Sequence, residues 1–236
     1  MYTFLLTILP PLIILFYFIF SDRFREPKAM IIKTFFLGIA ITIPAGYLNT
    51  FILDTFGNNT ALREAFLSGF VGGGPVEEIL KFLVLYYFIL REKEFNEPMD
   101  GIVYGVTASL GFATLENIDY VFHTNWGGVV TPEEIAFYRS FSAIPLHGLC
   151  GVIMGFNFGK YVFTSNQKYL YFSILIPILI HGSYNFIVGF NFLLALLIIF
   201  ITLLFSIKYH SSLKKLQKDK KNENEKKKNL IYILSF

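Results

Sequence analysis

Long apolar stretches dominate the pattern of hydrophobic and polar positions along the chain. Crossing a bilayer as a helix takes about 20 mainly apolar residues, and seven stretches are long enough. They cover residues 2–20, 30–53, 66–90, 99–122, 137–159, 169–187 and 189–207. The pattern therefore predicts an all-α fold, a polytopic membrane helix bundle with about seven transmembrane helices.

Basic residues between these stretches predict how the bundle is oriented. The alternate loops hold only Arg63 and Arg139, and Lys81 lies inside a stretch. Cytoplasmic loops carry an excess of Lys and Arg, so we expect the N-terminus outside and the C-terminus in the cytoplasm. The other seventeen of the 20 basic residues lie in the segments 21–33, 91–98, 160–168 and 208–228.

The composition changes near residue 209. Residues 1–209 are expected to form the integral membrane domain, and residues 210–236 a basic, solvated cytoplasmic tail. This tail accounts for the net charge of +3, so we predict no nucleic-acid partner. Adhesion of the tail to anionic membrane lipid is the alternative interpretation.

Composition narrows the class of protein further. Apolar residues make up 54% of the chain and charged residues 16%, whereas soluble domains carry about 25% charge. Cys150 is the single cysteine, which excludes a disulfide scaffold. An ordinary soluble enzyme and a disordered chain are excluded as well, which leaves a multi-pass membrane protein.

Ionisable residues inside the predicted spans mark the candidate functional site, because charge inside a membrane is costly. Counted from the predicted helix ends at a rise of 1.5 Å per residue, one of them on each of the four stretches (Glu77, Glu116, His147 and His181) lies in the outer half of the bilayer. Their common depth predicts one buried cluster that opens towards the outer face. The candidates are Glu77, Glu78 and Lys81 in the third stretch, Glu116 in the fourth, His147 in the fifth and His181 in the sixth.

Local spacing adds detail around the two adjacent glutamates. Glu77 and Lys81 are four residues apart and Glu78 and Lys81 three, so either carboxylate can pair with the lysine. The run 72–75 reads Gly-Gly-Gly-Pro, and we expect a helix to start there. The free N–H groups of such a helix start would favour the nearby negative charge.

The chemistry of this residue set points to hydrolysis of a peptide bond by one of two routes. A carboxylate can take a proton from water while His181 and Asn185, which share a helix face, stabilise the oxyanion. The same groups could instead hold a zinc ion that activates the water. The cofactor is therefore either none or zinc, and the candidate zinc ligands are Glu77, Glu116, His147 and His181.

At these residues the chain resembles the PrsW family of bacterial intramembrane proteases. The motifs occur in the order of the family within residues 75–185, and the wider group that includes the CAAX-processing and bacteriocin-processing proteases shares the last of them. Glu116 departs from that wider group, which has histidine there. The motifs are Glu77-Glu78-x-x-Lys81, Phe112-x-x-x-Glu116-Asn117, His147-x-x-x-Gly151 and His181-x-x-x-Asn185.

The resemblance implies an intramembrane endopeptidase in the bacterial cell membrane. It implies Glu77 as the general base, although the sequence does not separate it from Glu78, and Glu116 as a group that helps to hold the water. His181 and Asn185 would form the oxyanion hole, with His147 as a further site residue and Lys81 and Asn117 in support. The implied substrate is a single-pass membrane protein, an anti-sigma factor, cut first near the extracytoplasmic face.

Two other functions remain open from the sequence. Buried Glu and His residues also serve as proton relays in transporters, although a relay should span the whole bilayer. A scaffold that binds single-pass membrane proteins without cleaving them is the third candidate.

Overall fold

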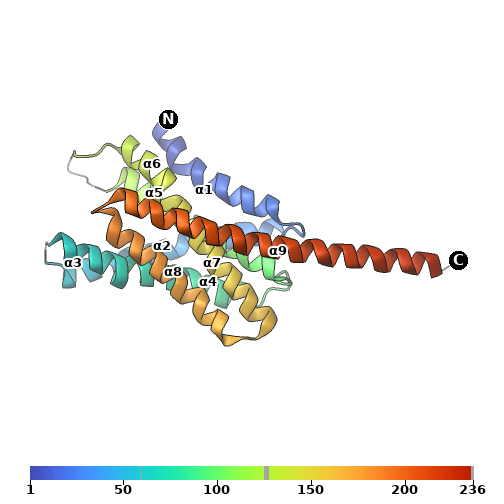
Figure 1. Cartoon of the computed structure of the whole chain (residues 1–236). Coiled ribbons are helices and arrows are strands. Elements are labelled where there is room, and N and C mark those ends of the chain that lie inside the picture. The colour runs from blue at the N-terminus through green and yellow to red at the C-terminus, as the bar shows by residue number, and fades with distance from the viewer. Residues whose placement is uncertain (59, 125–127, 235–236) are drawn as a thin grey trace.

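The structure is a computed structural model that describes residues 1–58, 60–124 and 128–234, with side chains up to residue 222. All regular structure in these ranges is helical (Figure 1). The elements are α1 (Tyr2–Ser21), α2 (Lys28–Phe56), α3 (Ala61–Phe66), the π-helix η1 (Leu67–Glu77), α4 (Glu78–Val84), the π-helix η2 (Leu85–Ile89), α5 (Pro98–Phe122), α6 (Pro132–Phe141), α7 (Ala143–Thr164), α8 (Gln167–Val188) and α9 (Phe192–Leu234).

The predicted polytopic helical membrane bundle is confirmed. In the described ranges five helical segments are long and apolar enough to cross a membrane on their own: α1, α2, α6 with α7, α8, and residues 192–222 of α9. The other two predicted spans, residues 66–90 and 99–122, are also helical but carry the carboxylates of the candidate site. α5 lies in the interior, where every residue from Met99 to Thr114 is buried.

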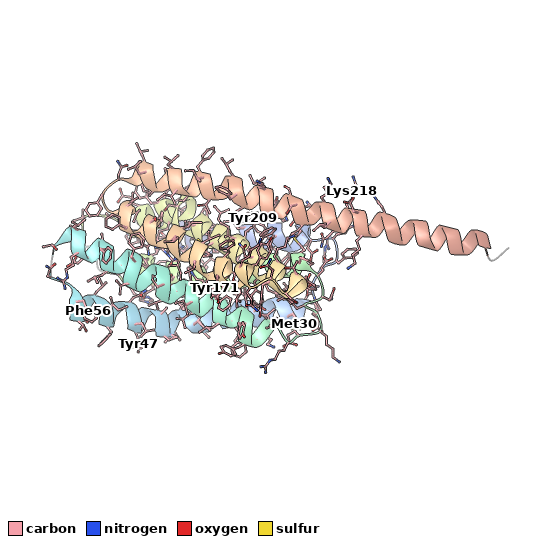
Figure 2. All side chains as sticks on the ribbon, turned by 60° about the horizontal axis from the view of Figure 1, so that its bottom comes forward. Met30, Tyr47, Phe56, Tyr171, Tyr209 and Lys218 are labelled. Atoms are coloured by element: carbon pink, nitrogen blue, oxygen red, sulfur yellow. The ribbon has the colours of Figure 1, made fainter. Side chains whose placement is uncertain are left out.

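The loops rich in basic residues meet at one end of the bundle, as alternating spans require. Lys33 near the start of α2 pairs with Glu92 in the loop before α5 at 2.5 Å. At the opposite end, Thr3 donates a hydrogen bond to Glu133 beside α6. Figure 2 shows Phe56 at that opposite end and Lys218 where α9 leaves the bundle. The assignment of the basic end to the cytoplasm stays a prediction.

Glycines allow α5 and α7 to pack with their backbones in contact. A Cβ atom added to Gly101 or Gly105 on α5 would overlap the carbonyl oxygens of Gly155 or Gly151 on α7. Small residues at four-residue spacing are a common means of close helix packing in membranes. This contact, which we call the glycine seam, brings the site residues of α5 and α7 within reach of each other.

Two local features differ from the expectations. The predicted span 137–159 lies within a segment long and apolar enough to cross a membrane, but it is not one helix, because the chain breaks at Ser142 between α6 and α7. Pro145 explains the break, since its ring would clash with the carbonyl of residue 141 in a continuous helix. The run Gly72 to Pro75 does not start a helix either: it lies inside η1, and the N–H of Glu78 bonds to the carbonyls of Gly74 and Pro75.

The structure also differs from the expected solvated tail. α9 runs without interruption through residue 209, and residues in its next two turns pack against the bundle. Leu213 is 1% exposed and Gln217 is 4% exposed. The division of the chain at residue 209 is otherwise untested and stays a prediction.

Candidate active site

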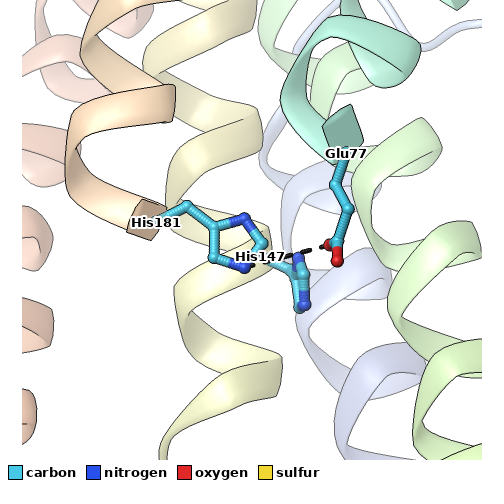
Figure 3. A group of neighbouring side chains, drawn as sticks. All are labelled: Glu77, His147 and His181. Atoms are coloured by element: carbon cyan, nitrogen blue, oxygen red, sulfur yellow. Dashed lines mark ion pairs between the residues drawn. The ribbon is translucent and has the colours of Figure 1, made fainter. Parts of the chain in front are cut away.

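The six ionisable residues predicted from the spans meet in one buried cluster. Glu77 ends η1, Glu78 and Lys81 lie on α4, Glu116 on α5, His147 on α7 and His181 on α8. Each is at most 14% exposed at its side chain. Figure 3 shows Glu77 and the two histidines pointing towards one another from three different helical segments.

Lys81 organises the centre of the cluster. Its ammonium donates to Glu78 Oε1 at 2.7 Å and to His147 Nδ1 at 2.9 Å, and it lies 4.3 Å from the ring centre of Phe112. Because an ammonium group only donates, Nδ1 of His147 must accept. Nε2 of that ring then carries the hydrogen and donates to Glu116 Oε2 at 3.0 Å.

His181 is held from the other side by Glu78. Nδ1 of His181 donates to Glu78 Oε1 at 2.8 Å, so its Nε2 is free to face Glu77 Oε2 at 3.9 Å. Its ring stands edge-on to that of His147, with ring centres 4.8 Å apart. This arrangement orients His181 as a second carboxylate orients a catalytic or metal-binding histidine.

Glu77 keeps one carboxylate oxygen without a hydrogen-bond partner. Asn49 on α2 donates to Oε1 at 3.1 Å, whereas Oε2 is buried and unpartnered within the described part of the chain. Lys81 lies 3.7 Å from Oε2. A buried oxygen without a partner is costly, so it marks the point at which a water, a substrate group or a metal would bind.

A pair of residues on α6 and α5 closes the outer side of the cluster. Arg139 donates through Nη2 to Glu116 at 2.6 Å and through Nε to Asn117 at 2.7 Å. Asn117 in turn donates to the backbone carbonyl of Thr7 on α1 at 2.8 Å. Asn117, predicted as a supporting residue, therefore links three helices.

A cavity of about 520 Å³ opens beside the cluster. Arg139, Tyr120, Tyr184 and Asn185 line it, together with residues of η1, α6 and the end of α8. Asn185 also lies against Gly73, and a Cβ atom at Gly73 would overlap its amide and approach Glu77. Asn185 is thus placed between the cavity and the cluster, in line with its predicted position near the oxyanion.

Sequence reasoning missed Arg139 and Asn49. Arg139 was counted with a loop, but its number falls within the predicted span 137–159, so the rule that flagged the other charges could have been applied to it. Asn49 lies in the second apolar stretch, and its only signal is an amide among apolar neighbours. The catalytic roles assigned to the predicted residues stay predictions, although the structure brings them together.

The hydrogen bonds of the possible ligand atoms decide how well a metal ion fits this cluster. One ligand atom each from Glu77, His147 and His181 lies within 4.8 Å of the others. Glu77 Oε2 and His181 Nε2 are free, but both nitrogens of His147 are engaged, so His147 would first have to release Lys81. A metal therefore fits the residues after one hydrogen bond is rearranged.

A multi-pass helical bundle with buried carboxylates and histidines beside a cavity has the construction of an intramembrane protease. The sequence model of the PrsW family, described as intramembrane metalloproteases, matches residues 26–208. The chain is 35% identical over 211 residues to Protease PrsW of Clostridioides difficile (strain 630), covering 86% of this chain and 87% of that protein. It is 39% identical over 184 residues to Protease PrsW of Bacillus subtilis (strain 168), covering 76% of this chain and 79% of that protein.

The chain belongs to the PrsW family. It is a peptidase and a multi-pass protein of the bacterial cell membrane. The transporter alternative is not favoured, since the relatives named here are proteases. No solved structure matches the chain.

Proposed function

We propose that the protein cleaves a single-pass membrane protein near the extracytoplasmic face, as the first cut in an anti-sigma factor, and that Glu77 activates the attacking water. The observation that supports this most directly is the buried, unpartnered Oε2 of Glu77, which faces His181 Nε2. The cavity beside the cluster has the position of a substrate site, since Asn185 borders both.

The charges of the cluster sum to −1 before any proton or metal is added. Glu77, Glu78 and Glu116 supply three negative charges, and Lys81 and Arg139 supply two positive ones. One additional positive charge makes this buried cluster neutral, and buried charge is tolerated best when it is paired. A proton supplies that charge in the glutamate route, and a zinc ion that holds its water as hydroxide supplies it in the metal route.

The steps then follow from the positions of the side chains. Glu77 accepts a proton from water as the oxygen attacks the scissile carbonyl, and it later delivers this proton to the leaving amine. His181, protonated at both nitrogens, donates from Nε2 to the developing oxyanion together with the amide of Asn185. Arg139 and His147 hold Glu116 at the outer edge, where it orients the water.

The family description also implies a metal. Glu77, His147 and His181 would hold it, and a bound zinc ion would supply Lewis-acid activation of water and of the carbonyl. In that case Lys81 would lose its bond to His147 and pair with the glutamates alone. Measuring the metal content of the protein therefore distinguishes the glutamate mechanism from the metal-dependent one.

The test uses the purified full-length protein in proteoliposomes with a membrane-anchored anti-sigma factor as substrate. Glu77→Gln should lower the cleavage rate by at least about 1000-fold, as loss of a general base does at the upper end, with the melting temperature unchanged. Glu64→Gln, an exposed change on the same helical segment, is the matched control and should cleave normally.

Two results would contradict the proposal. Normal cleavage by Glu77→Gln would exclude Glu77 as the base. One zinc per chain by elemental analysis, lost in Glu77→Gln and in His181→Ala, would replace the glutamate mechanism by a metal-dependent one.

A further inference from the structure

A second group of carboxylates lies at the basic end of the bundle, outside the candidate active site. Asp22 follows α1, Glu26 lies in the connection to α2, and Glu97 and Asp100 begin α5. We call these four residues the acidic cluster. One oxygen each from Asp22, Glu26 and Asp100 lies within 4.8 Å of the other two. Asp22 is 3% exposed and Asp100 is 0% exposed.

Half of the buried aspartate oxygens in this cluster are satisfied by the chain. Asp100 Oδ2 accepts the N–H groups of Asn96 and Glu97, each at 2.8 Å. Asp22 Oδ1 accepts the N–H of Phe24 at 3.1 Å and the amide of Gln217 at 2.6 Å. These bonds fix both carboxylates in place.

The other two oxygens, Asp22 Oδ2 and Asp100 Oδ1, are buried without a hydrogen-bond partner in the described ranges. Glu26 adds a third carboxylate within 4.8 Å of the other two, and one of its oxygens accepts the hydroxyl of Tyr104. Native proteins rarely leave such groups unsatisfied. Two fixed, buried oxygens beside a third carboxylate therefore indicate a bound group that all three share.

The charges around the acidic cluster do not balance. Four carboxylates face one basic partner in the described part of the chain, Lys220, whose Nζ lies 3.9 Å from Glu97. Arg23 and Arg25 in the same connection are exposed to solvent. The cluster thus needs additional positive charge.

A proton and a cation supply that charge differently. A proton shared between Glu26 and Asp100 joins two carboxylates but leaves Asp22 Oδ2 without a partner. A cation bound between the three carboxylates would compensate Asp22 as well as the other two. Because the donors are carboxylates, with no histidine or cysteine among them, the preferred ions are hard divalent cations such as Mg²⁺ and Ca²⁺ rather than zinc.

We propose that Asp22, Glu26 and Asp100 form a divalent-cation site for an ion of the Mg²⁺ or Ca²⁺ class. The site would join the α1–α2 connection to the start of α5, and Gln217 would bring α9 against it. It uses no residue of the active site, so it stands whether or not the proposed function holds.

The experiment measures thermal unfolding of the full-length protein in detergent after treatment with chelator, in a Glu77→Gln background that removes the alternative metal ligand. Addition of Mg²⁺ or Ca²⁺ should raise the melting temperature by at least about 4 °C, since a ligand that binds only the folded state stabilises it. Asp22→Asn and Asp100→Asn should lose this shift. Asparagine keeps one acceptor oxygen at each position, so both variants should fold.

Asp54→Asn is the matched control, an exposed aspartate at the other end of α2, and it should keep the full shift. Isothermal titration with each cation should show one site per chain in Glu77→Gln and none in the double variant with Asp22→Asn. The proposal is overturned if neither cation binds or stabilises the protein. It is also overturned if acidification alone stabilises the chelated protein as much as either cation does, because a shared proton would then satisfy the cluster.

Discussion

At the scale of single residues, Arg139 supplies the positive charge that Glu116 needs. Both side chains are nearly buried, at 13% and 14% exposed, and their contact distance is 2.6 Å. Arg139 also fixes Asn117, so one side chain positions two residues of the Phe112–Asn117 motif. We therefore regard Arg139 as a positioning residue rather than a catalytic one.

Replacing Arg139 tests this role. Arg139→Gln should lower kcat of cleavage by about 10- to 100-fold, as loss of a group that orients a site residue typically does, because Glu116 and Asn117 lose the side chain that positions them. Arg139→Lys should recover part of the rate, since it restores the charge but not the second hydrogen bond. The measurement is cleavage in proteoliposomes across a range of substrate concentrations.

Arg63→Gln provides the comparison for Arg139→Gln. Arg63 belongs to the same end of the bundle but is exposed, and it bonds to the carbonyl of Phe56. Cleavage by this variant should match that of the unchanged protein. Equal losses in the two variants would show that charge at this end, rather than the contact with Glu116, sets the rate.

Residue spacing could predict part of the site. The spacing predicted that Lys81 can pair with either glutamate, and in the structure Glu78 is the closer partner, at 2.7 Å. The spacing could not predict that Lys81 also bonds to His147, or that Asn49 bonds to Glu77, because these contacts join separate helices. Packing decides which faces of two helices meet. The spacing of residues along a single sequence does not reveal such contacts.

At the scale of elements, η1 places the two glutamates. Its eleven residues follow a π-helix, whose hydrogen bonds join residues five apart. Pro75 has no N–H to offer, and the wider helix accommodates it without a break. The sequence predicts the position of the irregularity at Gly72–Pro75 but not its structure. Composition does not distinguish the start of a helix from a widened helix.

At this scale, the contribution of the glycine seam to stability can be tested by substitution. Gly155→Leu should lower the free energy of unfolding by about 3 kcal/mol or more, because overpacking typically costs about 1–3 kcal/mol and here the side chain would meet backbone atoms of Gly101. Thermal unfolding in detergent would measure the loss, and cleavage should fall with it.

Gly46→Ala is the corresponding control for the seam. Gly46 lies on α2, and a Cβ atom there would meet no atom within 4 Å. Replacing glycine by alanine in an open helix position stabilises a helix by about 1 kcal/mol. A neutral or slightly raised melting temperature is therefore expected, and a loss as large as that of Gly155→Leu would argue against the seam as the cause.

At the scale of the whole molecule, the seven apolar stretches were enough to predict the bundle. A stretch of about 20 apolar residues has few alternatives to a membrane helix, so length and hydropathy decide the architecture. They could not predict that α9 continues past the bundle (Figure 1), since a lysine-rich segment is equally compatible with a solvated coil. The contacts of Gln217 with Asp22 and Glu97 supply the missing information.

Gln217 connects the two ends of the chain, and its removal tests that connection. Gln217→Leu should lower the free energy of unfolding by about 1–3 kcal/mol, because two buried carboxylates lose their donor. Lys215→Ala, an exposed change on the same helix, should have no measurable effect. If the two variants unfold at the same temperature, α9 does not stabilise the bundle through this residue.

The glycine seam also determines where a substrate can enter. A helix with its side chains is about 10 Å across, and the touching backbones of α5 and α7 leave no room for a polypeptide between them. The path between α5 and α7 is therefore closed to a substrate. The cavity opens on the side of α6 and α8, so the substrate segment of our proposal would approach Glu77 there, with Arg139 and Asn185 among the polar groups that line its way.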